Sequence, residues 1–183
     1  LPEELIAQQP LAERSASRLL VADSEGGFKD LRFCDLDRLL RTGDLLVVND
    51  TRVRPARVKG RKASGRSVDV LFVKAVTDRD WEVLMKGTWR AGQVIEVTPD
   101  ARLTILGREG GRTVVRIEGP LPVAEWFQAH GCMPLPPYIK RPPTDQDREW
   151  YQTVFDKEEG AIAAPTAGLH FTSALLNQLA TRG

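Results

Sequence analysis

This chain has few cysteines and histidines, the residue types that form disulfides and most often hold zinc. Its 183 residues include two cysteines and two histidines, and neither His130 nor His170 lies at a metal-ligand spacing from a cysteine or carboxylate. We therefore predict no bound metal. Cys34 and Cys132 lie far apart without a Cys-x-x-Cys partner, so two unrelated buried thiols are favoured over a disulfide.

Long apolar runs and an excess of one charge are also missing. No stretch approaches the length that crosses a bilayer, and no charged-then-apolar leader precedes the first Leu-Pro pair, so we expect a cytoplasmic protein with no membrane partner. The 26 Lys and Arg residues nearly balance the 25 Asp and Glu residues, which gives a net charge of +1. This balance excludes a bulk polycation but not RNA binding, which needs only a local basic face.

Short β-rich runs dominate the middle of the chain. Gly or Pro separates most of them at nearly regular spacing, which is typical of a small antiparallel barrel or sandwich. We therefore predict an inserted, antiparallel all-β barrel domain over residues 57–119. The runs are Val58 and residues 67–76, 81–85, 93–97, 102–106 and 113–117.

The segments before and after this block mix strand and helix patterns. Residues 19–23 and 28–33 predict a hairpin that turns at two glycines, 26 and 27. The continuous apolar run at residues 45–48 predicts a strand buried on both faces. Helices are predicted at residues 36–41, 122–130 and 145–154, and after Thr172.

These patterns predict the fold class. Residues 1–56 and 120–183 are expected to form parts of an α/β main domain, a partial barrel, into which the β-barrel is inserted. The chain stops just after a predicted helix, where an α/β unit normally continues into another strand. We therefore expect a fragment of a longer protein.

A polar segment follows the apolar run at residues 45–48. Asn49, Asp50, Thr51 and Arg52 come directly after this predicted strand, at the edge where open α/β sheets place ligands. Arg52 offers a planar fork for a carboxylate or phosphate, and the other three offer an amide, a carboxylate and a hydroxyl. The alternative is an ordinary turn in which Arg52 pairs with Asp50, and the spacing alone favours that turn.

A proline-rich stretch over residues 133–143 fits neither a helix nor a strand. Its prolines stiffen an extended backbone, which presents Tyr138, Lys140 and Arg141 at low entropic cost. The tyrosine ring could stack on a base while the two cations meet phosphates. Composition alone leaves a rigid linker equally open as an interpretation.

Small residues dominate a third segment, residues 160–172. They allow a ligand to approach the backbone closely, and the N-terminus of the helix that Thr172 caps favours an anion. His170 is the residue type best suited to proton transfer near neutral pH. The alternative is a histidine that simply packs at a helix start. No phosphate-loop Gly-Lys-Thr follows, which argues against an NTPase.

Five segments, in order along the chain, resemble the queuosine-pathway ribosyltransferase-isomerase family. Each segment alone is a weak match, but together they span nearly the whole chain, which makes the resemblance specific. The segments are residues 1–8 with 18–20, 43–57, 134–141, 151–153 and 160–172.

This resemblance implies an enzyme that transfers the ribosyl part of S-adenosylmethionine to 7-aminomethyl-7-deazaguanine at the wobble position of a tRNA. The ribose is isomerised to an epoxycyclopentane, which gives epoxyqueuosine-tRNA, while adenine and methionine depart. S-adenosylmethionine is then a co-substrate, and the resemblance implies no cofactor and no metal. The family fold is similar to the predicted one. We expect a monomer whose partners are S-adenosylmethionine and this tRNA.

Residue types suggest roles within such a reaction. We hypothesise that His170 or Asp50 transfers protons, and that Arg52 holds the methionine carboxylate or a tRNA phosphate. The residues expected to bind substrate are Asn49, Thr51, Arg52, Thr166, Ala167 and Gly168, and those expected to engage the anticodon loop of the tRNA are Tyr138, Lys140 and Arg141.

Two departures from the family accompany the resemblance. Family members are considerably longer, and the loop at residues 86–89 is shorter than the basic loop of the family at that point. Half of a barrel does not complete an active site, so an inactive isolated piece is expected. The alternative function is a non-catalytic tRNA- or RNA-binding module made of the β-barrel and the proline-rich stretch. A generic methyltransferase is poorly supported, because no Gly-rich turn follows an early strand.

Overall fold

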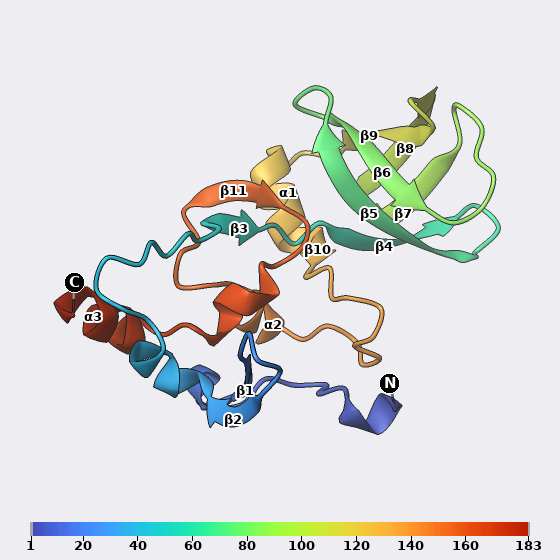
Figure 1. Ribbon diagram of the computed structural model, residues 1–183. Coiled ribbons are helices and arrows are strands. Elements are labelled where there is room, and N and C mark those ends of the chain that lie inside the picture. Colours follow the sequence, from blue (N-terminus) through green and yellow to red (C-terminus); the bar gives the residue numbers. More distant parts are fainter. Residues whose placement is uncertain (1, 183) are drawn as a thin grey trace. The chain divides into compact units, whose positions relative to one another are not determined.

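The computed structural model describes residues 2–182, and its largest element is a closed antiparallel β-barrel of six strands. The strands follow the order β4-β5-β6-β9-β8-β7, and pairing of β4 with β7 closes the barrel (Figure 1). The antiparallel barrel expected from the β-rich runs is therefore present. Its strands are β4 (Arg57–Lys62), β5 (Ser67–Ala75), β6 (Asp80–Met85), β7 (Val94–Thr98), β8 (Ala101–Glu109) and β9 (Arg112–Glu118).

Alternating side chains fill the interior of the barrel. In β5 the buried residues Val68, Val70 and Phe72 alternate with more exposed ones, as expected for a strand with one face turned inward. A bulge between Phe72 and Lys74 interrupts the register with β6, and such bulges bend strands so that a sheet can curl and close. The other large, fully buried side chains of the strands are Val58, Val83, Ile95, Leu103, Ile105, Val115 and Ile117.

A glycine allows the two strands that close the barrel to approach each other. The closing pairs are Arg61 with Glu96 and Lys62 with Ile95. A Cβ at Gly60 would lie 2.4 Å from Ile95 Cγ2 and 2.8 Å from the Glu96 carbonyl oxygen. Because real Cβ atoms do not approach other atoms so closely, only glycine fits here without a shift of the strands.

Helix α1 (Val123–His130) packs two aromatic rings against the barrel core. Trp126 and Phe127 are fully buried. Their rings meet the Phe72 ring edge-on, with centroids at 5.8 and 4.9 Å, and the Phe127 ring also meets Trp81 at 5.1 Å. Edge-to-face pairs of this kind contribute about 0.5–1.5 kcal/mol beyond the burial of their area, so α1 belongs to the same folded unit as the barrel.

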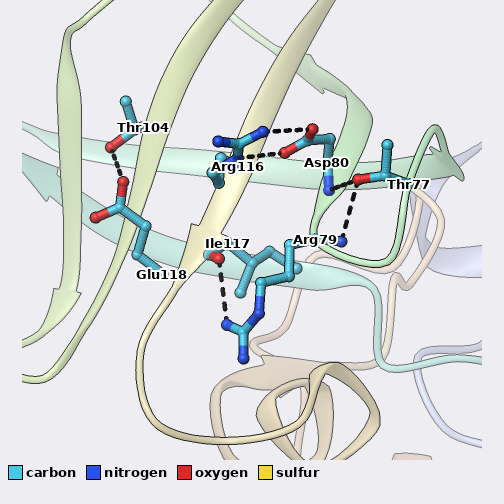
Figure 2. A network of polar contacts seen from close by, with 7 residues as sticks. All are labelled: Thr77, Arg79, Asp80, Thr104, Arg116, Ile117 and Glu118. Atoms are coloured by element: carbon cyan, nitrogen blue, oxygen red, sulfur yellow. Dashed lines mark hydrogen bonds and ion pairs between the residues drawn. The ribbon is translucent and has the colours of Figure 1, made fainter.

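A polar network ties strand β6 to strand β9 (Figure 2). The Asp80 carboxylate accepts hydrogen bonds from two nitrogens of the Arg116 guanidinium, at 2.7 and 2.8 Å. The Asp80 N–H donates to the Thr77 hydroxyl at 3.0 Å, and Arg79 donates to the Ile117 carbonyl at 3.5 Å. Hydrogen bonding from Arg116 lowers the pKa of Asp80, so this carboxyl stays ionised well into the acidic range.

The remaining elements are short. Strands β1 (Arg18–Ala22) and β2 (Phe28–Arg32) form the predicted antiparallel hairpin. Strand β3 (Thr51–Val53) pairs in parallel with β11 (Glu158–Ala161), and β10 (Gly131–Cys132) pairs with β4. The helices are the 3-10 helices η1 (Glu3–Leu5), η2 (Arg14–Ala16), η3 (Phe33–Arg38) and η4 (Thr166–His170) and the α-helices α2 (Asp147–Trp150) and α3 (Ser173–Thr181).

The chain forms two compact units. One comprises Leu1–Val53, Pro136–Pro142 and Glu149–Gly183, and the other comprises Arg54–Leu135 and Pro143–Arg148 and contains the barrel. The domain boundaries predicted after residues 56 and 119 remain a prediction, and residues 1 and 183 lie outside the described residues. None of the helices within residues 2–182 has the length and apolar character that a bilayer crossing requires.

The predicted α/β main domain is wrong. Strands make up 34% and helices 21% of the structure, and within residues 2–182 no separate α/β domain accompanies the barrel. The apolar run at residues 45–48 is not a strand, and Leu45 and Val47 are 87% and 81% exposed. An apolar run forms a buried strand only where a neighbouring strand supplies hydrogen bonds, and no strand of the described chain pairs with this run.

Three smaller expectations also need correction. Both cysteines are free as favoured, but neither is fully buried, because Cys34 is exposed and Cys132 is half-buried. The helices predicted at residues 36–41 and 145–154 are shorter or shifted, at Phe33–Arg38 and Asp147–Trp150. Local side-chain bonds explain these differences. The Asp35 carboxylate accepts from the Arg32 N–H at 3.0 Å, and the N–H and hydroxyl of Thr144 both donate to Asp147. The helix cap predicted at Thr172 is confirmed, because its side chain accepts from the Leu175 N–H at 3.2 Å.

Candidate functional site

All predicted site residues belong to the compact unit that does not contain the barrel. They come from three segments, residues 49–52, 138–141 and 166–170, which are far apart in the sequence. Among the residues that the structure describes, no three His, Cys, Asp or Glu side chains are grouped to hold a metal ion. The predicted site residues carry amide, hydroxyl, carboxylate, guanidinium and imidazole groups.

A local turn leads into strand β3. The N–H and the hydroxyl of Thr51 both donate to the side-chain oxygen of Asn49, the N–H at 3.0 Å. The Asp50 carbonyl accepts from the N–H groups of Lys157 and Glu158, at 2.8 and 3.1 Å, which ties the turn to the start of β11. Within residues 2–182 the exposed Asp50 carboxylate itself has no hydrogen bond or ion pair, so it is available for proton transfer or ligand binding.

Arg52 pairs with a carboxylate that is distant in the sequence. Its guanidinium lies 3.5 Å from the Asp156 carboxylate, and not beside Asp50 as the turn interpretation expected. The Arg52 side chain is 55% exposed. An exposed pair of this kind contributes about 0–1 kcal/mol, so an incoming carboxylate or phosphate can replace Asp156 at little cost.

Gln152 holds strand β3 in place. Its side-chain oxygen accepts from the Val53 N–H at 2.8 Å, and its side-chain nitrogen donates to the Val53 carbonyl at 2.7 Å. Arg14 in turn donates to the Gln152 carbonyl at 2.5 Å. No role for Gln152 was predicted from the sequence. The signal that could have found it was the resemblance of residues 151–153 to the family.

The segment around His170 is packed through aromatic rings. The imidazole ring lies against Phe33, with centroids 5.3 Å apart and planes tilted by 42°. Phe33 meets Phe171 edge-on at 4.9 Å, and both phenylalanines are buried together with Leu175. His170 itself stays half-buried. Within the described chain His170 makes no hydrogen bond or ion pair with Asp50, so the two groups proposed for proton transfer are not directly coupled.

Residues 152 and 153 connect two of the predicted segments. Gln152 binds Val53 next to the 49–52 turn. The neighbouring Thr153 is buried against Gly168, where an added Cβ would lie 3.1 Å from Thr153 Cγ2. The chain thus brings the turn before β3 and helix η4 to adjacent residues of one short segment. Thr166 and Ala167 are exposed in that helix, and both remain open to a ligand.

The proline-rich segment is held by Gln8 and Glu3, two residues near the N-terminus. The Gln8 amide donates to the Tyr138 carbonyl at 3.1 Å and accepts from the Lys140 N–H at 2.7 Å. The Gln8 carbonyl accepts from the Arg141 guanidinium at 2.8 Å, and the Lys140 ammonium pairs with Glu3 at 2.5 Å. The Tyr138 ring is 46% exposed. Hydrogen bonds and an ion pair therefore fix the position of this segment. Like Gln152, Gln8 had no role predicted from the sequence.

Comparison with known proteins gives a match over the whole chain. Residues 1–183 match the family described as queuosine biosynthesis protein. Two curated relatives are both named S-adenosylmethionine:tRNA ribosyltransferase-isomerase. The one from Xanthomonas oryzae is 50% identical over 186 residues and the one from Geobacter metallireducens 46% identical over 189 residues.

These matches cover the entire chain but only part of each relative. The alignments take in 100% of this chain and 52% and 55% of the two relatives, so the chain spans about half the length of the curated relatives it matches. A crystal structure of S-adenosylmethionine tRNA ribosyltransferase from Thermotoga maritima is 28% identical, with a TM-score of 0.37, and covers 100% of this chain and 53% of that one.

Proposed function

Because the chain belongs to the queuosine biosynthesis protein family, we propose that it forms part of an S-adenosylmethionine:tRNA ribosyltransferase-isomerase. The observation that carries this proposal is identity of about half the residues, over the full length of the chain, to relatives that bear this name. The substrates of the proposed reaction are S-adenosylmethionine and a tRNA with 7-aminomethyl-7-deazaguanine at its wobble position. The products are epoxyqueuosine-tRNA, adenine and methionine.

The chemistry of the sulfonium defines what the site must supply. The positive sulfur acidifies the hydrogens on the adjacent C5′ carbon, so a positioned base can remove one of them and leave an ylide. Opening of the sugar ring then expels adenine. Asp50 and His170 are the proposed proton-transfer groups. In support, the Asp50 carboxylate is exposed and unpaired within residues 2–182, and Phe33 holds the His170 ring.

Substrate binding is proposed for two linked segments. Arg52 would hold the methionine carboxylate or a tRNA phosphate, since its fork matches both groups and its pairing with Asp156 is exposed. Gln152 bonds Val53, which directly follows residues 49–52, and the adjacent Thr153 packs against Gly168 of η4, which supports one shared site. The residues proposed to line this site are Asn49, Thr51, Arg52, Thr166, Ala167 and Gly168.

The proline-rich segment is the proposed contact for the anticodon loop. Tyr138 offers an exposed ring for stacking, and Lys140 and Arg141 offer cations for phosphates. We further propose a cytoplasmic monomer. Size-exclusion chromatography with light scattering on the whole enzyme, of which this chain is proposed to form part, would contradict the monomer if it gave a dimer mass at micromolar concentration.

Adenine release tests the proposed function. Purified protein is incubated with S-adenosylmethionine and tRNA that carries the aminomethyl-deazaguanine base, and adenine is measured by chromatography. Release that requires both substrates is expected if the protein supplies the complete site, and intact mass shows whether its chain is longer than 20.4 kDa. A longer protein that binds both substrates yet releases no adenine would contradict the proposal. Binding of tRNA without turnover would instead support the RNA-binding module.

Variants separate the two candidate bases. Asp50→Asn and His170→Gln remove a proton acceptor with little change of size. Loss of one general base is expected to slow turnover about 10²–10⁴-fold and to remove one limb of the pH–rate profile. His130→Gln, a change of the other histidine, is the matched control and should leave turnover unchanged. Full turnover by His170→Gln would exclude His170 as the general base. Full turnover by Asp50→Asn would exclude Asp50 in the same way.

A further inference from the structure

The outer face of the barrel carries a groove that is lined by none of the proposed active site residues. It has a volume of about 730 Å³ and lies over strands β4, β5 and β6. The hairpin turn between β4 and β5 borders it, and so does the loop that follows β6. All of its lining residues belong to the barrel unit, so the groove is complete within one folded body.

Cations surround this groove. Four of its lining side chains are Lys or Arg and only one, Asp69, is acidic. Arg57 is the cation that pairs with Asp69, at 2.9 Å. Lys62, Arg66 and Lys86 form no ion pair with any residue from 2 to 182. Three uncompensated cations around one groove make it complementary to a polyanion.

The floor and one wall of the groove are apolar. Leu71 of β5 faces Leu84 of β6 as a cross-strand pair, and Leu84 is 50% exposed. Trp89 forms the wall, and two contacts fix its ring. The indole N–H donates to the Lys86 carbonyl at 3.2 Å, and the Lys62 ammonium lies 3.8 Å from the ring centroid. The site thus combines a held aromatic ring, apolar side chains and cations.

We propose that this groove binds a single-stranded segment of RNA, with bases against Trp89 and Leu84 and phosphates beside Lys62, Arg66 and Lys86. Single strands expose both base faces and phosphates, which is the combination that aromatic and cationic side chains bind together. A duplex hides its base faces and would leave the apolar floor without a partner. An acidic peptide would satisfy the cations but has no ring to stack on Trp89.

This inference rests on the proposed function, because it assigns to the barrel a second contact with the RNA substrate. The groove would bind unpaired nucleotides. The anticodon loop would bind separately, at the proline-rich segment of the other unit. The two sites are separable by experiment. Binding of an unmodified oligonucleotide requires no chemistry, and release of adenine reports on the reaction alone.

Fluorescence anisotropy of the full chain with labelled oligouridylate, and with a blunt RNA duplex of equal length, tests the groove. Tighter binding of the single strand is expected. Trp89→Ala should weaken that binding roughly 5- to 150-fold, the size of one base–aromatic stack, whereas Trp89→Phe should keep most of it. Each of Lys62→Ala, Arg66→Ala and Lys86→Ala should reduce the slope of log K against log salt by about 0.7.

Lys74→Ala is the matched control, because this exposed lysine lies on β5 outside the groove. It should change neither affinity nor slope by a comparable amount, and circular dichroism verifies that each variant is folded. Equal binding by wild type and Trp89→Ala, a preference for the duplex, or displacement of the RNA by polyglutamate at similar charge concentration would overturn the inference. If adenine release by the wild type persists in that case, the groove is excluded while the proposed function stands.

Discussion

At the residue scale, single side chains in this protein take the place of backbone partners. Strand β3 has β11 on one edge only. Gln152 bonds both the N–H and the carbonyl of Val53, as a neighbouring strand would. An amide side chain can do this because it carries both a donor and an acceptor. The position of the turn at residues 49–52 therefore depends on one side chain as well as on the strand pair.

Replacing Gln152 tests this dependence. Gln152→Leu removes both bonds and leaves the backbone groups of the buried Val53 unsatisfied, so we expect a loss of about 1–3 kcal/mol in the free energy of unfolding. Gln152→Glu keeps the acceptor for the Val53 N–H and should lose less. Urea unfolding provides the measurement. Gln9→Ala, at an exposed glutamine with no hydrogen bond among the described residues, should cost nearly nothing, and an equal loss in Gln9→Ala would contradict the argument.

The Asp80–Arg116 pair predicts how stability changes in acid. Arg116 lowers the pKa of Asp80 in the folded protein, so folding favours the ionised carboxyl. The stabilisation is then complete above the unfolded pKa of about 4 and is lost as the pH falls through the lower, folded pKa. Asp80→Asn should lower the thermal midpoint at neutral pH, and its difference from wild type should shrink well below pH 4. A difference that stays constant with pH would contradict the role of this charge.

Residue-scale contacts were the least predictable from the sequence. Asp50 was the expected partner for Arg52 because it lies two residues away, but pairing of β3 with β11 brings up Asp156 instead. Gln8 and Gln152 belong to segments that were noticed, yet their partners lie on distant parts of the chain. Sequence patterns report which face a residue occupies, and they do not report which distant residue faces it.

At the scale of elements, predictability follows the sequence separation of the partners. The barrel strands were predicted because their β-rich composition and the glycines and prolines between them are local signals, as in the pair β8–β9. The run at residues 45–48 carried an equally strong apolar signal and is exposed coil. A strand forms only when a partner is in place, and no local pattern reports whether that partner is present.

Closure of the barrel is the element-scale feature that a single substitution should disturb. Gly60→Ala places a Cβ against Ile95 and the Glu96 carbonyl of β7. We expect the seam between β4 and β7 to open, with a loss of about 1–3 kcal/mol typical of overpacking. Urea unfolding gives the size of the loss, and hydrogen exchange should locate it at the two seam strands. Lys59→Ala, on the outward face of the same strand, is the control, and an equal loss there would point to strand propensity instead.

At the scale of the whole molecule, the two units differ in how far they bury their large apolar side chains. The barrel unit buries most of its large apolar side chains among its strands and α1. In the other unit the run at residues 45–48 is exposed at every position, and Leu45 and Leu46 line a pocket of about 280 Å³ with Leu176 and Leu179 of α3. A contiguous exposed apolar run attracts other apolar surfaces, whereas scattered single residues do not.

The exposed run at residues 45–48 leads to a prediction about apolar binding and self-association. The 183-residue chain should bind an apolar fluorescent dye and should self-associate with rising concentration. Leu45→Lys with Val47→Lys places charge on the two most exposed positions of the run and should remove most of the dye signal and the self-association. Val76→Lys, a change at an isolated exposed valine of the barrel unit, is the control and should alter neither. Dye binding that survives the double change would show that residues 45–48 are not the surface that binds the dye. Loss of binding only in the double variant would identify residues 45–48 as the apolar surface that binds the dye.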